Sequence, residues 1–437
     1  MKRFFISTIA ILVCAAVCCA QTSRIFCIST GPGEDASTQA GVSWSTDTTV
    51  TSTSLVLALE ADVSWTDAVR CIPQQKELCT VFDGVWSDDA EGKETYEHAV
   101  SVKCGIMLDN LRRNSDYKYY IETDDGERSS VHHFRTAGAS EWSACIISDF
   151  HSYPPLPGRL QSAMAMIDTV ARKDPSLDWI FSPGDVVAWG GSWSFWKRLF
   201  EEKNFERYMW GRVNGNHDNW TKESQVTHDF DIPNDYFLGT SYFPRNSYEG
   251  ELGVCYHFRY GNALFVMLNT EDMRKKGEFE AASAWTESVI ARARKSDNPP
   301  LYVVVCMHYE WFLGTNGKTS QYGRWAEVFD RAGVDLAVAG NNHVYLRTLP
   351  LYDGNKTDGK KKGTVYLQTS SSDNGRGRKI SETDFFNSEL IENRWTEGSH
   401  TVSAIHMDVN DRRMVLTLLD REGNEIDSCR VYPKHRK

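Results

Sequence analysis

The sequence predicts an α+β chain of more than one domain, in which an N-terminal β-sandwich is followed by a domain of alternating strands and helices. Three observations lead to this prediction. The chain has 437 residues, more than one hydrophobic core ordinarily serves. Residues 24–137 contain short alternating apolar runs separated by turn residues. Near Ser140 the pattern changes to apolar strands that alternate with helices.

The composition is that of a soluble globular protein, with 41% hydrophobic and 24% charged residues. The formal net charge is −11. An acidic surface repels phosphate backbones, so we expect no nucleic-acid partner. An anionic small substrate would need local positive charge, which a bound metal ion can supply.

The N-terminus has the pattern of an export signal. Lys2 and Arg3 precede an apolar stretch over 4–17, and Ala20 before Gln21 is a plausible cleavage point. Residues 1–20 are therefore predicted to be a signal peptide, and the protein to be secreted, periplasmic or at the cell surface. No later run is apolar for about 18 residues, so no transmembrane segment is expected in the mature chain. An uncleaved anchor and a lipoprotein are the alternatives.

Eight cysteines remain after such cleavage, in a compartment that permits disulfides. Cys71 and Cys79 are close enough in sequence to form a disulfide. Cys145 and Cys306 lie inside apolar strand patterns, which predicts small buried side chains. No C-x-x-C pair indicates a structural zinc site.

In the first region the runs 41–45, 54–59, 98–104 and 117–121 are spaced as in an antiparallel sandwich. Nothing there clusters His with carboxylates, which favours a non-catalytic module. In the second region, strands are predicted over 144–147, 179–181, 211–214, 254–260, 263–268, 301–307, 334–339 and 363–370. Helices are predicted over 159–172, 193–208, 281–295 and 322–332. Short strands are predicted over 401–432. Such alternation implies a sheet covered by helices on both sides.

Polar clusters follow five of these apolar strands. They occupy residues 149–151, 184–185, 215–218, 308 and 340–343. Loops after the strands of an open α/β sheet converge on one edge, so the five clusters are expected to meet in space. A single His is more often a satisfied polar residue than a ligand, but five coincident clusters are hard to explain in that way.

Residues of these types suit hydrolysis of a phosphate ester. Two cations about 3.5–4 Å apart screen the substrate's charge and lower the pKa of a bound water. A carboxylate can bridge them, and imidazole and amide oxygen complete their shells. Glycines before Asp185, Asn216 and Asn341 give tight turns that point ligands inward.

The pattern Asp149-x-His151, Gly184-Asp185, 215–218, His308 and Gly340-x-x-His343 resembles that of the calcineurin-like metallophosphoesterases. The β-rich first region, and the Tyr and Arg at 345 and 347, are similar to the purple acid phosphatases, which carry a fibronectin-type-III-like domain before the catalytic one. The resemblance implies such a domain over 24–138 and a catalytic domain over 140–433 with four α/β/β/α layers. It covers nearly all of the mature chain, including the hairpin at 422–427.

The resemblance also implies a role for each site residue. One metal ion would be held by Asp149, His151, Asp185 and His343. The other would be held by Asp185, Asn216 and His308, with Asp185 bridging. His217 would protonate the leaving group or bind the phosphoryl oxygen, and Asp218 would orient His217. The ions would be Fe, Zn, Mn or Mg, and the reaction would be hydrolysis of a small phosphomonoester or phosphodiester by a metal-bound hydroxide.

Two departures from the purple acid phosphatase pattern stand out. Ala188 occupies the position of a metal-binding Tyr, while His151 supplies a ligand which those enzymes lack. Asn341 stands where the family has a His on the second metal. An amide oxygen binds soft divalent ions less strongly than imidazole does. The second ion is therefore expected to be bound more weakly or to be a harder ion.

Several side chains near the predicted site have two interpretations. Arg347 is either a phosphate clamp or half of a structural ion pair. Six aromatic residues either stack on a base or aryl leaving group or pack the core, the more common outcome. They are Trp189, Trp193, Trp196, Trp220, Trp311 and Phe312.

Two other functions remain open at the level of sequence. Because Asn341 replaces a ligand of the family, the chain could be a degenerate member that binds phosphate ligands without turnover. The sandwich leaves room for a surface adhesion protein, in which loss of the first domain abolishes function while His217→Ala does not.

Overall fold

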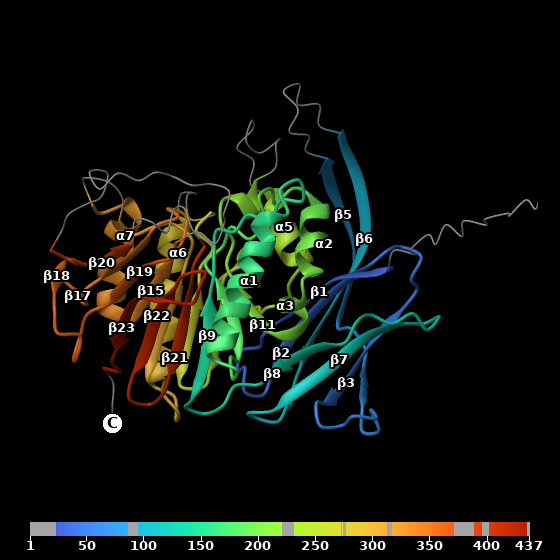
Figure 1. Cartoon of the computed structure of the whole chain (residues 1–437), viewed down its shortest axis with the longest axis horizontal. Coiled ribbons are helices and arrows are strands. Elements are labelled where there is room, and N and C mark those ends of the chain that lie inside the picture. The colour runs from blue at the N-terminus through green and yellow to red at the C-terminus, as the bar shows by residue number, and fades with distance from the viewer. Residues whose placement is uncertain are drawn as a thin grey trace, which may run out of the picture.

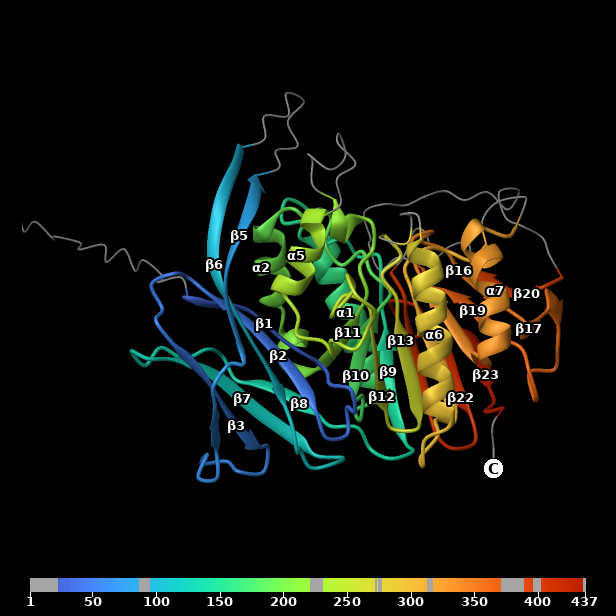
Figure 2. The ribbon, with the colours of Figure 1, turned by 180° about the vertical axis from the view of Figure 1, so that it is seen from behind.

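The computed structural model describes residues 23–85, 95–220, 231–271, 273, 277–312, 317–370, 389–395 and 402–434. The predicted signal peptide at 1–20 lies outside this part of the chain. A β-rich N-terminal region lies beside a larger region of sheets and helices (Figures 1 and 2). No helix in the described residues is long and apolar enough to cross a membrane.

The N-terminal region contains two four-stranded antiparallel sheets that share one core. The first has the order β1 (Ile25–Pro32), β2 (Ala40–Thr46), β6 (Thr95–Leu108) and β5 (Gln75–Val85). The second has the order β4 (Val69–Cys71), β3 (Thr53–Leu59), β7 (Asp116–Thr123) and β8 (His132–Arg135). Trp44 and Tyr119 are fully buried between them. The Trp44 indole donates to Thr53 Oγ1 at 3.0 Å, which joins the two sheets.

The expected disulfide between Cys71 and Cys79 is wrong. Cys71 ends β4 opposite Leu55, whereas Cys79 lies in β5 opposite Ser101, so the two cysteines belong to different sheets and no bond joins them. Closeness in sequence did not reveal that the chain changes sheets between these strands. Cys145 and Cys306 are fully buried, as predicted.

The larger region contains two sheets packed face to face. The six-stranded sheet has the order β11 (Met209–Arg212), β10 (Trp179–Ser182), β9 (Trp142–Ile146), β21 (Ala404–Val409), β22 (Met414–Leu419) and β23 (Glu425–Val431). The seven-stranded sheet has the order β12 (Tyr256–Tyr260), β13 (Ala263–Met267), β14 (Tyr302–Cys306), β15 (Leu336–Ala339), β19 (Val365–Gln368), β16 (Tyr345–Thr348) and β20 (Ile391–Trp395). A small ladder joins β17 (Leu351–Tyr352) and β18 (Asn355–Lys356).

Helices cover the outer faces of both sheets. The six-stranded sheet is covered by α1 (Gly158–Lys173), α2 (Trp193–Phe200) and α3 (Lys203–Arg207), and the seven-stranded sheet by α6 (Glu278–Arg294) and α7 (Ser320–Ala332). A separate apolar layer fills the space between the sheets. The predicted α/β/β/α arrangement is therefore confirmed (Figure 1).

Some predicted elements differ from the structure. The single helix expected over 193–208 is interrupted at Glu202, whose backbone is extended at φ −74° and ψ 136°. The strand expected over 211–214 ends at Arg212, which leaves the next residues to form a loop. The helix α5 (Asp231–Gly239) and the strands β16 and β20 were not predicted.

The sandwich is packed tightly onto the larger region. A Cβ at Gly41 would lie 1.8 Å from the carbonyl oxygen of Tyr242, so only glycine permits this approach of two backbones. Ser29 Oγ donates to the carbonyl oxygen of Thr240 at 2.8 Å. Figure 2 shows β5 and β6 rising from the sandwich beside α2. These contacts hold the two regions in one arrangement.

Candidate metal centre

The five predicted clusters converge at one edge of the two facing sheets. Each cluster lies in the loop after a strand, and these strands are β9, β10, β11, β14 and β15. The three from the six-stranded sheet are parallel to one another, as are the two from the seven-stranded sheet. Their carboxyl ends therefore bring short polar loops together, as the sequence pattern predicts.

Five of the predicted ligand residues have a left-handed backbone. The φ angles are 54° at Asp149, 44° at His151, 54° at Asp185, 63° at Asn341 and 61° at His343. Residues with a Cβ rarely adopt this conformation, which costs about 1–3 kcal/mol each and persists only where the surroundings enforce it. Such strain concentrated at one point is a feature of functional sites.

One group of donors contains Asp149, His151, Asp185 and His343. All four are buried, and one ligand atom from each lies within 4.8 Å of the others. His151 Nε2 is 3.1 Å from Asp185 Oδ2, and His343 Nε2 is 3.6 Å from Asp149 Oδ1. The four residues predicted for the first ion thus come together.

A second group contains Asp185, Asn216 and His308. His308 Nε2 lies 3.4 Å from Asp185 Oδ1 and 3.0 Å from Asn216 Oδ1. Asp185 therefore faces one group with each of its two carboxylate oxygens. Asn216 is half-buried, so this second group lies nearer to solvent.

The spacing and chemistry of these donors fit metal ions. With metal–ligand bonds of about 2.0–2.2 Å, neighbouring donors in tetrahedral or octahedral shells lie about 3.0–3.5 Å apart. His308 Nδ1 is 2.8 Å from the carbonyl oxygen of Pro183, which can only accept a hydrogen bond. In the neutral imidazole, the Nε2 lone pair then faces the oxygens of Asp185 and Asn216. The lone pairs of His308 Nε2 and of the Asp185 and Asn216 oxygens thus converge, and a cation between them would offset their mutual repulsion.

The pKa values of these side chains reflect the same convergence of buried charges. Burial alone would lower the pKa of His308, but the carboxylates of Asp185 and Asp149 raise it to about 10. Burial raises the pKa of Asp149 to about 6. Burial would also raise the pKa of Asp185, but His308 and His217 hold it well below its usual value. A proton on His308 thus occupies the place of a cation, and metal binding would release it.

Two glycines allow backbone and ligand side chains to approach closely. A Cβ at Gly215 would lie 2.2 Å from Asp185 Oδ1 and 2.7 Å from His308 Cε1. A Cβ at Gly340 would lie 2.6 Å from Asp149 Oδ2. Both positions therefore need glycine for its missing side chain, in addition to the turn that the sequence predicts.

The imidazole of His217 lies beside the first group. Its Nδ1 is 2.9 Å from the carbonyl oxygen of Ala188, and its ring centroid is 4.6 Å from that of His151. Its backbone N–H donates to Asp185 Oδ1 at 2.8 Å. Since Nδ1–H donates to Ala188, proton exchange with a substrate would take place at Nε2.

The contacts of Asp218 contradict its expected role of orienting His217. The carboxylate accepts hydrogen bonds from the backbone N–H groups of Asp185, Val186, Val187 and Gly215 at 2.8–3.0 Å. The two residues occupy a 3-10 turn, η1 (His217–Asn219), which points consecutive side chains in different directions. Asp218 therefore fixes the loop that carries Asp185. Burial, and then the charge of Asp185, raise the pKa of Asp218 to about 6.

The aromatic residues divide into two sets. Trp193, Trp196, Trp311 and Phe312 are buried and pack the apolar cores. Trp189 and Trp220 are half-buried, and their ring centroids lie 6.4 Å and 4.0 Å from that of His217. Only this second set is placed where a substrate could touch it.

Arg347 is a structural residue. Its guanidinium donates to both oxygens of Asp427 at 2.8 Å and 3.1 Å, and Tyr345 Oη donates to the same carboxylate at 2.6 Å. The ion pair joins β16 to β23. Of the two interpretations of Arg347, the ion pair is thus the one observed.

Sequence reasoning missed two polar residues of the site. Ser148 Oγ donates to Asp149 Oδ2 and lies 2.6 Å from Thr369 Oγ1. Glu310 accepts a hydrogen bond from the side-chain amide of Asn341. Both are close in sequence to a predicted cluster, and this proximity is the signal that would have found them.

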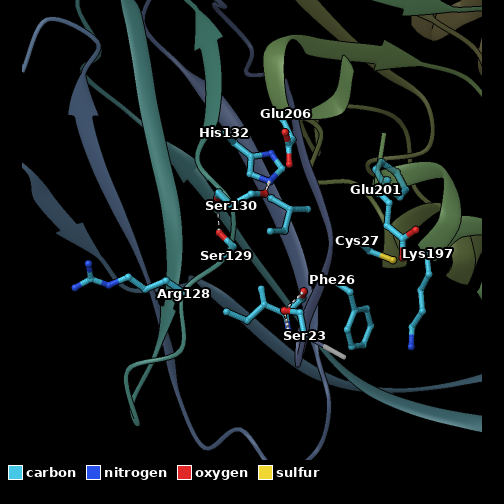
Figure 3. Close-up of a pocket in the computed structure, with 13 residues that line it drawn as sticks. Ser23, Phe26, Cys27, Arg128, Ser129, Ser130, His132, Lys197, Glu201 and Glu206 are labelled. Carbon is cyan, nitrogen blue, oxygen red and sulfur yellow. Dashed lines mark hydrogen bonds between the residues drawn. The ribbon is translucent and has the colours of Figure 1, made fainter. Parts of the chain in front are cut away.

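A separate hollow lies between the sandwich and the helices of the six-stranded sheet (Figure 3). It has a volume of about 510 Å³ and is lined by residues of β1, β8, α2 and α3, among them His132, Lys197 and Glu206. Its lining includes none of the predicted ligands. The convergent polar groups needed for phosphoester chemistry are thus at the sheet edge and outside this hollow.

Comparisons with known proteins agree with this geometry. Residues 144–345 match the calcineurin-like phosphoesterase family model. Two uncharacterized proteins from two strains of Mycobacterium tuberculosis are 24% identical to the chain over 303 residues, which cover 62% of this chain and 55% of each relative. The chain thus spans about half the length of these curated relatives.

Two solved structures share the fold. A purple acid phosphatase from yellow lupin seeds matches with a TM-score of 0.68 at 15% identity, over 93% of this chain and 74% of that one. A structure of PhoD matches with a TM-score of 0.59 at 12% identity, over 94% of each chain.

Proposed function

Because the resemblance to the calcineurin-like phosphoesterases is confirmed over residues 144–345, we propose that this protein is an exported hydrolase that uses two metal ions to cleave small phosphoesters. The observation that supports this proposal most directly is the position of the Asp185 carboxylate. One of its oxygens faces His151 at 3.1 Å and the other faces His308 at 3.4 Å. A buried carboxylate placed in this way is suited to bridge two ions.

When bound, the two ions would screen the phosphoryl oxygens and lower the pKa of an attacking water. The first would be held by Asp149, His151, Asp185 and His343, and the second by Asp185, Asn216 and His308, with Asn341 as a further candidate. The first set, with two imidazoles and two carboxylates, suits Zn, Fe or Mn. The second has fewer imidazoles and suits a harder ion such as Mn or Mg.

The chain's own groups provide the remaining chemistry. His217 exchanges a proton with the leaving-group oxygen, or donates a hydrogen bond to a phosphoryl oxygen, through Nε2. Ala188 fixes the ring through Nδ1, at 2.9 Å. Asp218 holds the Asp185 loop through the backbone N–H groups of Asp185, Val186 and Val187, and its own loop through that of Gly215. The pieces needed for hydrolysis are then fixed before the substrate arrives.

We further propose that the preferred leaving group contains a flat ring, either aryl or nucleobase. Trp189 and Trp220 flank His217, and their ring centroids are 5.9 Å apart. Stacking against such indoles contributes about 0.5–1.5 kcal/mol beyond area burial. Both tryptophans are half-buried, so part of each residue is accessible to solvent.

A reconstitution assay tests the proposal. The full chain is stripped of metal by a chelator, then supplied with Mn, Zn or Fe and assayed on a panel of aryl, nucleotide and alkyl phosphomonoesters and phosphodiesters. We expect metal-dependent turnover that favours the aryl and nucleotide substrates. Trp220→Leu should raise KM for those substrates and leave alkyl phosphates unchanged. Equal rates on aryl and alkyl esters would refute the leaving-group proposal alone.

A binding protein without turnover is the second candidate, and Asn341 is the observation that favours it. That candidate predicts that inorganic phosphate binds to the metal-loaded chain while no ester in the panel is hydrolysed. The adhesion alternative predicts that the sandwich alone accounts for the protein's main activity. Export is tested separately, since protein recovered outside the cytoplasm should begin at Gln21. An intact N-terminus would contradict cleavage after Ala20.

A further inference from the structure

The second metal position lacks one imidazole, and the structure shows which groups stand in its place. We propose that Glu310 fixes the side-chain amide of Asn341 so that its Oδ1 becomes a ligand of the second ion, and that this pair selects a hard cation such as Mn²⁺ or Mg²⁺ over Zn²⁺. The inference rests on the proposed two-metal function and deepens it. Glu310 is a positioning residue that acts through Asn341.

Asn341 is held between the two groups of donors. Its backbone N–H donates to Asp149 Oδ1 at 3.0 Å. The N–H of Gly340 donates to the carbonyl oxygen of His308 at 2.8 Å. The backbone of Asn341 is left-handed, with φ of 63°. The backbone of residues 340–341 is therefore anchored to a proposed ligand of the first ion through Asn341 and to a proposed ligand of the second through Gly340.

The carboxylate of Glu310 determines which way the amide points. Asn341 Nδ2 donates to Glu310 Oε2. An ionised carboxylate can only accept hydrogen bonds, so the NH₂ group must face Glu310 and Oδ1 must face away from it. In the described part of the chain no donor occupies that Oδ1. An amide oxygen fixed in this way is available to a cation.

The position of Glu310 is itself fixed by the fold. Glu310 follows His308 in the loop after β14, and its carbonyl oxygen accepts a hydrogen bond from Thr319 Oγ1 at 2.7 Å. Thr319 caps the N-terminus of α7. Glu310 and Asn341 are both half-buried, at the solvent side of the site. The pair is thus held by a strand end and a helix start.

Replacing imidazole by this pair changes the chemistry of the second position. A nitrogen donor is lost and an oxygen donor takes its place, and the carboxylate of Glu310 adds negative charge nearby. Oxygen donors and negative charge favour Mg²⁺ and Mn²⁺, whereas imidazole favours Zn²⁺. The departure at Asn341 therefore changes which ion is preferred and keeps the position functional.

The test is a titration of the chelator-stripped full chain with Mn²⁺ and with Zn²⁺, followed by calorimetry and by the electron paramagnetic resonance signal of bound Mn²⁺. Glu310→Ala should weaken the weaker Mn²⁺ site by about 10- to 100-fold, the usual effect of losing a group that orients a ligand. The tighter site should stay within about 2-fold. Glu310→Gln should lose less, because its amide can still accept from Nδ2.

Two control variants test whether Glu310 acts by orienting the Asn341 amide or only by its negative charge. Glu327→Ala removes one negative charge from an exposed position on α7, where Glu327 pairs with Arg331, and should leave both Mn²⁺ sites unchanged. Asn341→His supplies its own imidazole, so it should tighten Zn²⁺ at the second position. In that background Glu310→Ala should have no further effect, because the amide it orients is gone.

The results separate this inference from the proposed function. If wild type binds two Mn²⁺ and turns over while Glu310→Ala binds them equally well, the inference is wrong and the proposed function stands. If the loss persists in the Asn341→His background, Glu310 acts without Asn341, which also overturns the inference. If wild type binds fewer than two ions, both are wrong. Thermal melts and Glu310→Gln guard against a misfolded Ala variant.

Discussion

His217→Ala is the substitution that separates catalysis from metal binding in this site. The imidazole touches the backbone of Ala188 and the rings of His151 and Trp220. The contact with Asp185 is made by the backbone N–H at 2.8 Å, which the substitution leaves in place. The bridging carboxylate should therefore keep its position and both ions should remain bound.

The expected loss of turnover is about 10²- to 10⁴-fold, the range for removal of a general acid–base group. That range corresponds to about 2.7–5.4 kcal/mol of transition-state stabilisation. The effect should fall mainly on kcat, because His217 is proposed to act on the leaving group. The lower end applies if a water molecule enters the space of the ring and supplies the proton.

The assay compares substrates whose leaving groups differ in pKa. If His217 protonates the leaving group, the loss should be large for alkyl phosphates and should shrink for activated aryl esters, whose anions leave without a proton. Metal content is measured on the same samples. His406→Ala is the matched control. His406 Nε2 lies 2.9 Å from Asp174 Oδ2, and neither residue belongs to the site. The turnover of this variant should equal that of wild type.

Two results would refute this reasoning. Loss of a full metal equivalent in His217→Ala would make the imidazole a ligand. A loss of rate that is the same for every leaving group would show that His217 binds the phosphoryl oxygen and does not act as the acid.

The remaining predictions concern the bridge, the glycine beside it, the distant ion pair and the colour. Asp185→Ala should abolish turnover and cost at least one metal equivalent, since two cations would repel each other at short range without it; a variant that keeps both ions and its rate would exclude a bridging role. Gly215→Ala should lower metal affinity, because its Cβ would lie 2.2 Å from Asp185 Oδ1, and unchanged binding would contradict the described packing. Arg347→Ala should destabilise the fold by about 3 kcal/mol in urea unfolding, because Asp427, whose side chain is largely buried, loses its charge partner and keeps the hydrogen bond from Tyr345, while the folded fraction keeps its kcat. Iron-loaded protein should be colourless or pale because Ala188 offers no tyrosinate, and a purple preparation would show that a tyrosinate ligand exists.

The sequence predicted the site better than it predicted the roles within it. The clusters at Asp149, Asp185 and His308 each follow an apolar run typical of a buried strand. The rule that strand ends converge was therefore enough to bring these three residues together. The left-handed backbone at five of these residues could not be predicted from sequence, because few non-glycine residues adopt such angles, although Asp, Asn and His do so more often than other types. The role of Asp218 was misjudged since neighbours in sequence point apart in a 3-10 turn.

Elements with weak local signals were misplaced for similar reasons. The helix break at Glu202 has no proline or glycine to mark it, and two consecutive glutamates favour a continuous helix. Strand β20 contains charged and half-buried residues, so its pattern resembles a loop. The contact between Glu310 and Asn341 joins two strand ends far apart in the chain, and one sequence gives no sign of such a pair.

The central claim is that one carboxylate bridges two ions that together carry out hydrolysis. Its most direct test is a titration of chelator-stripped protein with Mn²⁺, in which bound metal per chain and turnover of an aryl phosphoester are measured on the same samples. The account predicts that turnover appears only as the second equivalent binds, and that Asp185→Ala shows no such rise. Full turnover with one equivalent bound, or two equivalents bound without turnover on any phosphoester, would contradict it.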